Sequence, residues 1–467
     1  MEPAYLPNVA RPMVKIGNMI IFTLLCLFFG LVTPFSYFTL IINSAIFGLL
    51  AQAQIKKLLL KYKIAVWSLL GLGYSTIYFF QTDYQKLVIG LVVFSLFYWL
   101  SHRLYSNLNQ LVLIVFFCLF IGLFGIALID GVQLRAQLAQ DISPPFMTDM
   151  QAYQNSLNLY KKTGDYYRSF AVSLQGLGVN YGTDQYAGEI WGWKQPLIFT
   201  LWKMIPGKAA GVQWLAVMAF GLILLAAYKI TRIFLSPQQA LISPFLIWPY
   251  LHYPLVEMTL LQVEWWALVF FFLGFMAYLL KRYWLTGIVF ALCLAVRELF
   301  AIPILGLVII QILRKRFKSA LSLSLPTILV FLPYYYFYHL KNVFQYEAFD
   351  LLSGETLRSG ALSKWELVRT TLAYNSWSYG SWIIRPFLVL LVINSIGLLF
   401  LIILKKKRWQ FLSLLTVFLL FFLFSFMLNM MDTWHDYWGI YYIPMLLLTT
   451  PVVFHYFDTN ALRIFKF

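Results

Sequence analysis

Long apolar runs alternate along the chain with short clusters of Lys and Arg, and this alternation constrains the fold more than any other feature. Each run approaches the roughly 20 apolar residues that a helix needs to cross a bilayer. The sequence therefore predicts an all-α polytopic membrane protein with about fourteen transmembrane helices. Their expected ranges are 17–34, 36–53, 64–81, 85–101, 110–130, 210–228, 239–256, 259–280, 283–297, 299–313, 320–338, 384–404, 410–430 and 439–457.

The composition agrees with a membrane protein. Of the 467 residues, 61% are hydrophobic and 11% are charged, whereas soluble domains typically contain about 45–50% and about 25%. This balance excludes a soluble enzyme, a disordered chain and a nucleic-acid-binding protein. Cys26, Cys118 and Cys293 all lie within apolar runs, so we expect them to pack rather than to form disulfides or bind zinc.

The basic clusters fall at every second boundary between apolar runs. Because cytoplasmic loops carry an excess of Lys and Arg, this pattern predicts a multi-pass protein of the plasma membrane with both termini in the cytoplasm. Under this topology Glu2 and Asp458 are the only cytoplasmic carboxylates, and the other acids lie toward the outer face. The net charge of +17 then reports orientation rather than an anionic partner.

Two predicted outer loops, 131–208 and 339–383, are too long to be simple connections. Long ordered loops in compact folds are usually functional. The expected organisation has N-terminal transmembrane helices without an assigned role at 1–109, a transmembrane body with both loops at 110–457, and a cytoplasmic tail at 458–467.

The first long loop contains a helix that begins with a capping box. Thr148 is the expected N-cap and Gln151 the N3 residue, and the helix is expected to end at Gly164. Asp149 lies in the first turn, where the helix dipole favours its ionised form. An ionised carboxylate just outside the bilayer suits a general base for a hydroxyl nucleophile. The alternative is that Asp149 only stabilises the helix start. Tyr153 lies one turn later on the same face.

Several stretches resemble motifs of the GT-C superfamily of membrane glycosyltransferases, which includes protein mannosyltransferases and the lipid A aminoarabinose transferase. The Asp149-(x)3-Tyr153 spacing, followed by Tyr160-Lys-Lys-Thr-Gly-Asp-Tyr166, resembles the first extracytoplasmic loop of these enzymes. Softer matches lie at Trp191–Leu197, Ala295–Pro303 and Trp434–Pro444.

The resemblance implies a GT-C-like fold whose catalytic region is 110–457, with a helical first outer loop. It also implies an inverting transfer of a sugar from a polyprenyl-phosphate donor to a hydroxyl on a glycan, lipid or protein, at the extracytoplasmic face. Asp149-Met150-Gln151 stands where many relatives carry Asp-Glu or Asp-x-Asp. We therefore predict no metal ligand and no required cofactor; a divalent metal is the alternative, without support from the sequence.

Two cations are candidates for the donor phosphate. Arg297 is the stronger one, because a guanidinium binds phosphate oxygens in bidentate fashion. Lys194 is the second, although interfacial lysines often only extend to lipid headgroups. Pro196 is suited to the first position of a helix at 197–205 that we expect to lie on the membrane.

Charged residues inside membrane helices usually face a cavity or a partner. Glu257 and Glu264 are seven residues apart, and we expect them to share a helix face. They would orient the acceptor or supply a second acid; alternatively, they pair with Arg297 or Arg385 to tie helices together. Glu298 is a further substrate-binding candidate or the partner of a neighbour.

The late segment adds His435 and Asp436 as candidates near the cavity mouth, with an ordinary interfacial loop as the alternative. His252 and His339 are expected to be isolated, and no histidine spacing supports zinc.

Two other functions remain alternatives. A transporter or flippase for lipid-linked glycans would need a polar path through the bilayer, and the inner helix halves contain few acids. A polymerase or ligase that uses lipid-diphosphate donors would be expected to carry an arginine-led outer loop.

Overall fold

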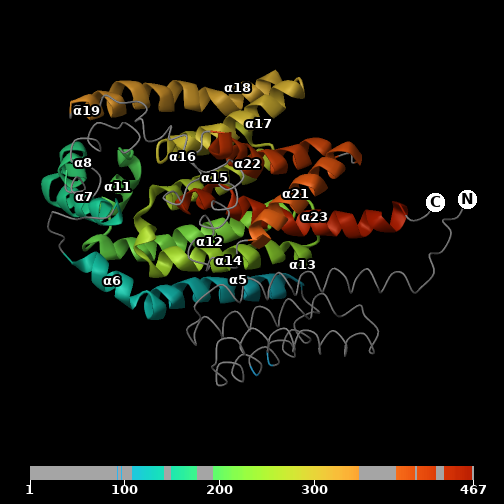
Figure 1. Cartoon of the computed structure of the whole chain (residues 1–467), viewed down its shortest axis with the longest axis horizontal. Helices are drawn as coiled ribbons and strands as arrows, with labels where there is room; N and C mark the ends of the chain where they lie inside the picture. Colours follow the sequence, from blue (N-terminus) through green and yellow to red (C-terminus); the bar gives the residue numbers. More distant parts are fainter. Residues whose placement is uncertain are drawn as a thin grey trace, which may run out of the picture. The chain divides into compact units, whose positions relative to one another are not determined.

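The computed structural model describes residues 108–140, 149–175, 193–345, 385–404, 407–427 and 436–464, together with Val92 and Leu96. Within these ranges every regular element is a helix and no strand occurs (Figure 1). The prediction of an all-helical chain is therefore confirmed for the described part. The first three predicted spans lie outside it, as does most of the fourth.

The elements follow the predicted apolar runs with short additional turns. The α-helices are α5 (Leu108–Gly125), α6 (Val132–Ala139), α7 (Asp149–Thr163), α8 (Tyr166–Gln175), α11 (Pro196–Lys203), α12 (Val212–Thr231), α13 (Pro237–Ala240), α14 (Ile242–Val256), α15 (Val263–Leu279), α16 (Tyr283–Leu294), α17 (Ala301–Leu313), α18 (Phe317–Pro326), α19 (Lys341–Phe344), α21 (Arg385–Leu404), α22 (Arg408–Met427) and α23 (Ile443–Ile464). The π-helical turns are η1 (Ile126–Asp130), η6 (Thr327–Phe331) and η7 (Tyr334–Leu340), and the 3₁₀ turns are η3 (Ala209–Gly211), η4 (Met258–Leu261), η5 (Glu298–Phe300) and η8 (Asp436–Tyr441).

Three described helical segments are long and apolar enough to cross a membrane. They are Gln110–Asp130, Ala209–Thr231 and Phe317–Phe344, and five shorter apolar helices of 10–17 residues accompany them. These apolar helices are compatible with a membrane protein. The last segment is longer than the predicted span 320–338, because η6, η7 and α19 continue α18 without a break. Helical structure thus extends into the start of the expected loop 339–383.

The chain divides into two compact units. The first comprises residues 1–126, 227–250 and 447–467, and the second comprises residues 127–226 and 251–446. In the first unit, the indole N–H of Trp248 donates to the carbonyl of Leu119 at 3.1 Å, and the hydroxyl of Ser243 donates to the carbonyl of Leu448 at 3.1 Å. These bonds satisfy polar atoms that are buried between apolar helices.

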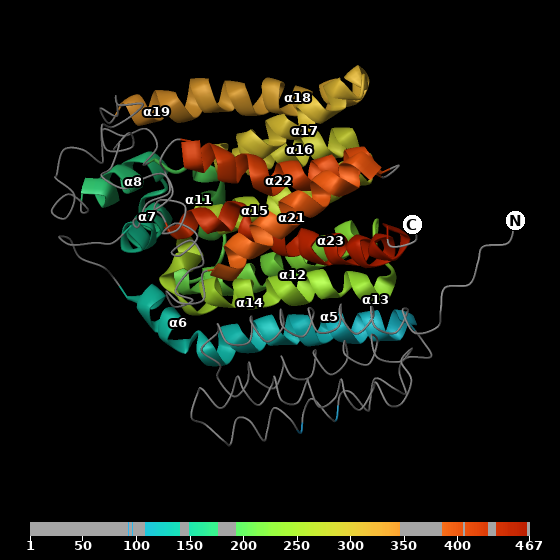
Figure 2. The ribbon, with the colours of Figure 1, turned by 45° about the vertical axis from the view of Figure 1, so that its right-hand side comes forward.

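In the second unit, α15, α16, α17, α18 and α22 pack against one another as neighbours. Two glycines permit close approach: a Cβ at Gly287 would lie 2.7 Å from the carbonyl oxygen of Ser322 on α18, and one at Gly306 would collide with Thr416 on α22. Small residues at such contacts let helix backbones pack closely. The short helices α7, α8 and α11 lie together beyond one end of this bundle (Figures 1 and 2). We call these three helices the cap.

Candidate active site

The cap begins with an α7–α8 hairpin whose turn was predicted from the sequence. α7 ends at Thr163, and Gly164 follows with φ 77°, a left-handed conformation that favours glycine. The amide of Gly164 donates to the carbonyl of Tyr160 at 3.0 Å, and the carboxylate of Asp165 accepts from the amide of Arg168 at 3.1 Å. Gly164 therefore ends α7, and Asp165 caps the start of α8.

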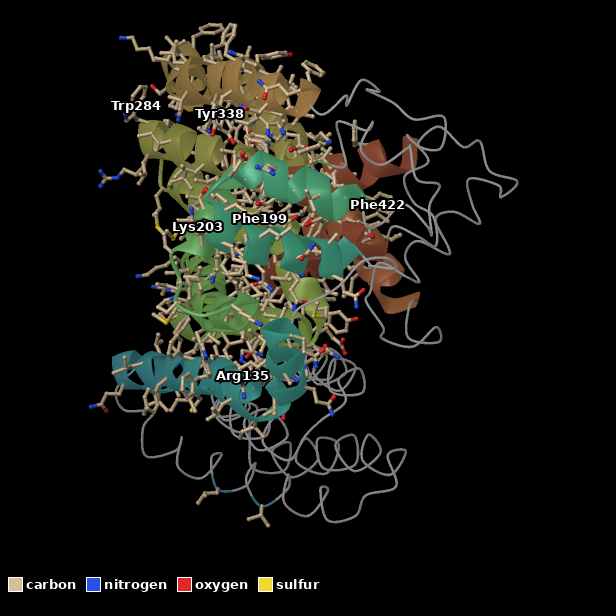
Figure 3. The ribbon with its side chains drawn as sticks, turned by 90° about the vertical axis from the view of Figure 1, so that its left-hand side faces the viewer. Arg135, Phe199, Lys203, Trp284, Tyr338 and Phe422 are labelled. Carbon is tan, nitrogen blue, oxygen red and sulfur yellow. The ribbon has the colours of Figure 1, made fainter. Side chains whose placement is uncertain are left out.

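An aromatic core holds the cap together. The ring of Tyr166 lies 5.7 Å from that of Tyr160 and 5.2 Å from that of Phe199, and Phe170 lies 5.7 Å from Phe199 and 6.0 Å from Tyr153. Figure 3 looks onto this end of the unit, with Phe199 labelled on α11. α11 begins at Pro196 as predicted, but Phe199 is fully buried. One face of the helix thus packs inside the protein.

Two hydroxyl groups of the cap tie it to neighbouring segments. The hydroxyl of Tyr166 donates to the backbone carbonyl of Lys194, and the hydroxyl of Tyr167 bonds to Nδ1 of His339 at 3.1 Å. Burial raises the pKa of Tyr166 and of Tyr167 above the usual value, so both stay neutral hydrogen-bonding groups. His339, expected to be isolated, has a partner in the cap.

Beneath the cap, Arg297 lies buried between two carboxylates. Its Nε atom is 2.9 Å from Oε1 of Glu264 and 3.1 Å from the hydroxyl of Tyr441, and its Nη1 atom is 3.0 Å from Oε1 of Glu298. The side chain of Gln195 donates to Glu298 at 2.9 Å. The predicted alternative that Glu264 pairs with Arg297 is therefore observed, as is the pairing of Glu298 with a neighbour.

Lys194 belongs to the same buried group, which we call the charge cluster: Lys194, Glu264, Arg297 and Glu298. The side chain of Lys194 is 6% exposed, its ammonium lies 5.8 Å from the ring centre of Tyr153, and it attracts the carboxylate of Glu298. The cluster contains two cations and two carboxylates. Burial of single charges is costly, and among the described side chains each cation of the cluster has a carboxylate that attracts it.

Glu257 departs from the prediction. α14 ends at Val256, Glu257 is extended with φ −124° and ψ 155°, and η4 separates it from α15. Glu257 and Glu264 therefore do not share a face of one helix. The seven-residue spacing was misleading because extended residues and a 3₁₀ turn interrupt the helix between them.

His252 also has a partner that the sequence spacing did not reveal. Its Nε2 atom lies 3.6 Å from Oδ2 of Asp130, although the two residues are far apart in the chain. Both residues lie near the ends of apolar helices, and this placement was the only feature of the sequence that could have indicated their contact.

Three of the predicted site residues, Asp149, His435 and Asp436, lie partly or wholly outside the part of the chain that the structure describes. α7 begins at Asp149 and η8 begins at Asp436, but the side chains of these two residues lie outside the described part, as does the whole of His435. Among the residues that the structure describes, no group of His, Cys, Asp and Glu could hold a metal ion.

A cavity of about 680 Å³ opens between the cap and the bundle. One part of its wall is apolar and comes from α11, α16, α18 and η6: Leu197, Ile288, Ala291, Leu292, Ala295, Pro326, Val330 and Phe331. The other part is polar and comes from the cap, η7 and α19: Tyr160, Asp165, Tyr166, Tyr167, Thr200, Tyr334, Tyr338 and Asn342. The motif Tyr160–Tyr166 supplies several of these polar residues, whereas the apolar wall was not predicted.

Neither the charge cluster nor Lys203 lines the cavity, but both lie next to residues that do. Ala295 lines it two residues before Arg297, and Tyr166 lines it while bonding to the backbone of Lys194. The ammonium of Lys203 lies 4.3 Å from the ring centre of Tyr160, at the polar end. Lys203 was not predicted as a site residue.

No protein-family model, curated protein or solved structure matches this chain.

Proposed function

We propose that this chain is an integral-membrane glycosyltransferase that moves a sugar from a polyprenyl-phosphate donor to an acceptor hydroxyl, with inversion. The cavity of about 680 Å³ carries the proposal. A lipid-linked donor is apolar along its chain and polar at its phosphate and sugar. The apolar wall on α16 and η6 suits the prenyl chain, and the tyrosine-rich end suits the headgroup.

Lys203 adds a cation suited to the donor phosphate. Its ammonium lies against the ring of Tyr160 rather than against a carboxylate in the described part of the chain. By contrast, the guanidinium of Arg297 already faces Glu264 and Glu298. In the proposal Lys203 contacts the phosphate at the polar end, while Arg297 and Lys194 stabilise charge on the leaving phosphate from beneath.

Asp149 is the proposed general base. It is the first residue of α7, where the helix dipole favours a carboxylate, and Tyr153 lies one turn later against Lys194. Asp149 would take the proton of the acceptor hydroxyl as the hydroxyl oxygen attacks the anomeric carbon. The bond from this carbon to the phosphate oxygen breaks, and polyprenyl phosphate leaves with the electron pair.

The remaining predicted residues have supporting roles in the proposal. Glu264 and Glu298 hold Arg297 in place, and the buried ring of Tyr153 positions the ammonium of Lys194 for the substrate. Glu257, His435 and Asp436 are proposed to contact the acceptor glycan, lipid or protein. The transfer requires no metal, because a phosphate monoester lipid is a good leaving group.

The proposal includes the orientation in the membrane. About fourteen spans, with both termini in the cytoplasm, would place the cap at the extracytoplasmic face of the plasma membrane. The apolar helices of the described part support a membrane location.

Purified full-length protein incubated with polyprenyl-phosphate sugars tests the proposal, with release of polyprenyl phosphate measured by mass spectrometry. We expect turnover by the wild type and a loss of about 10²–10⁴-fold in Asp149→Asn, which removes the base but keeps the side-chain shape. The exposed residue Arg168 provides a control, because Arg168→Gln should retain turnover.

Other outcomes would contradict the proposal. Movement of an intact lipid-linked glycan across proteoliposomes without cleavage would identify a transporter or flippase. Consumption of diphosphate-linked donors alone would identify a polymerase or ligase. Full turnover by Asp149→Asn would show that Asp149 only stabilises the start of α7.

A further inference from the structure

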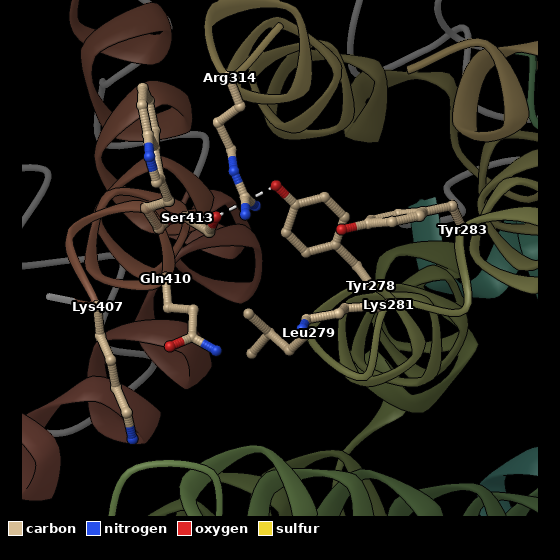
Figure 4. Close-up of a pocket in the computed structure, with 9 residues that line it drawn as sticks. Tyr278, Leu279, Lys281, Tyr283, Arg314, Lys407, Gln410 and Ser413 are labelled. Atoms are coloured by element: carbon tan, nitrogen blue, oxygen red, sulfur yellow. Dashed lines mark hydrogen bonds between the residues drawn. The ribbon is translucent and has the colours of Figure 1, made fainter. Parts of the chain in front are cut away.

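A second cavity lies at the end of α15 that is opposite Glu264. Glu264 is in the first turn of α15 and Tyr278 is in its last turn, so the rise of the helix separates them by about 21 Å. The cavity of about 160 Å³ lies where α15 and α17 end and where α16 and α22 begin (Figure 4). It is therefore separate from the proposed active site, and a ligand bound there is independent of the proposed function.

A chain of hydrogen bonds fixes the floor of this cavity. The side chain of Gln311 donates to the hydroxyl of Tyr278 at 2.6 Å, this hydroxyl lies 3.3 Å from Oγ of Ser413, and Ser413 donates to the carbonyl of Trp409 at 2.8 Å. Tyr278, Ser413 and Gln311 are almost fully buried. These hydrogen bonds join α15, α17 and α22, so the floor is an ordered polar surface and not a gap between lipid-facing helices.

Cations from three different helix boundaries line the cavity. Lys281 follows α15, Arg314 follows α17, and Lys407 precedes α22. Arg314 lies beside the bonded hydroxyl of Tyr278 (Figure 4), and its Cζ atom is 5.9 Å from the ring centre of Trp409. This ring contact limits the directions in which the guanidinium can point.

In the described part of the chain, neither Lys281 nor Arg314 forms an ion pair with a carboxylate. The sequence contains no Asp or Glu between Glu264 and Glu298, between Glu298 and Glu347, or between Glu366 and Asp432. The starts of α16 and α22 add the positive ends of two helix dipoles, and neither helix has an acid in its first turn. A dianionic group is the ligand that would offset this concentration of positive charge.

The backbone makes Lys281 and Lys315 a matched pair that differs in its position relative to the cavity. Lys281 and Lys315 have φ values of 62° and 57°, and they are the only non-glycine residues with positive φ in the described ranges. Each occupies the position after a helix where glycine is favoured. A lysine in this conformation costs about 1 kcal/mol or more. Lys281 lines the cavity, whereas Lys315 does not.

We propose that this second cavity binds a phosphate group, through Lys281, Arg314 and Lys407 above the floor formed by Tyr278 and Ser413. The group is carried either by an anionic lipid or by a soluble phosphate. Both sources present the same chemistry to the three cations, and the size of the cavity, far above the roughly 10–15 Å³ that admits one water, accommodates such a group.

The paired lysines supply a matched test with the full-length protein in detergent. One arm measures radiolabelled inorganic phosphate by equilibrium dialysis. The other measures retention of short-chain phosphatidic acid against phosphatidylcholine by native mass spectrometry. Lys281→Gly should weaken phosphate or phosphatidic acid binding about five-fold, and Lys315→Gly should leave it unchanged. Arg314→Gln should weaken it about ten-fold or more.

The outcomes separate the two sources. Retention of phosphatidic acid that inorganic phosphate does not displace assigns a lipid headgroup, and saturable binding of inorganic phosphate assigns a soluble phosphate. Equal losses in Lys281→Gly and Lys315→Gly would overturn the proposal, because diffuse surface charge would then explain the binding. Unchanged binding in Arg314→Gln, or no binding of either probe by the wild type, would also overturn it.

Discussion

The charged residues near the two ends of α15 differ in their burial and in their partners. At the end that carries Glu264, the cations Lys194 and Arg297 and the carboxylate of Glu264 are buried, and the half-buried Glu298 completes the cluster. At the other end, Lys281 and Arg314 line a partly open cavity, and the nearby sequence contains no carboxylate. The same side-chain types thus pair inside the protein at one end, and at the other end they line a cavity that we propose binds an external anion.

This difference has a physical origin. A buried charge loses the hydration that stabilises it, so Arg297 requires its partners for the fold to be stable. Cations in contact with water keep most of their hydration and contribute little to folding. Substitutions at the first end should therefore change the free energy of unfolding, and substitutions at the second end should mainly change ligand binding.

The largest effect is expected for Arg297→Met. The substitution leaves Glu264 and Glu298 buried without their cation, so we expect the free energy of unfolding to fall by about 3–5 kcal/mol. Chemical denaturation in detergent measures this loss. Adding Glu264→Gln and Glu298→Gln to the same variant should recover part of it, and a single Arg297→Met variant as stable as the wild type would remove the contrast between the two ends.

A smaller effect is expected when the apolar wall of the first cavity is filled. Leu292→Trp places a larger side chain into the space proposed for the prenyl chain, so donor turnover should fall about ten-fold, the equivalent of about 1.4 kcal/mol. Leu285→Trp is the control, because Leu285 is exposed on the same helix, as Leu292 is, but does not line the cavity. Equal turnover in the two variants would argue against a donor in this cavity.

Arg314→Gln should have little effect on folding. The side chain is partly exposed and has a ring contact rather than a carboxylate, so the free energy of unfolding should change by less than about 1 kcal/mol. The same denaturation experiment measures it. A loss comparable to that of Arg297→Met would show that both ends depend on their charges for stability.

The smallest effect has the opposite sign. Lys281→Gly and Lys315→Gly both relieve a left-handed lysine, so each should raise the free energy of unfolding by about 0.5–1 kcal/mol. The two gains should be similar, whereas only Lys281→Gly should weaken phosphate binding. A loss of stability in either variant would mean that its backbone is not strained.

The sequence predicted helices and their ends better than it predicted contacts. The apolar run 110–130 corresponds to α5 and η1, the start of α11 at Pro196 is correct, and Gly164 ends α7 as expected. These features depend on local chemistry, namely apolar length, the fixed φ of proline and the left-handed conformation of glycine.

Features that depend on tertiary packing were harder to predict. The break at η4 separates Glu257 from Glu264 although their spacing fits one helix face. Partners such as Asp130 for His252 lie on different helices, and no local pattern encodes their pairing. The apolar wall of the first cavity was also missed, because its residues have the same composition as every other apolar helix.

The central claim is that the cavity between the cap and the bundle holds a polyprenyl-phosphate donor. A photoreactive polyprenyl-phosphate sugar, cross-linked to the full-length protein and mapped by peptide mass spectrometry, tests it directly. The claim predicts labels on α16 and η6, at residues such as Leu292 and Val330, and competition by unlabelled donor. Labels spread evenly over exposed apolar positions that do not line the cavity, such as Leu285, without competition, would contradict it.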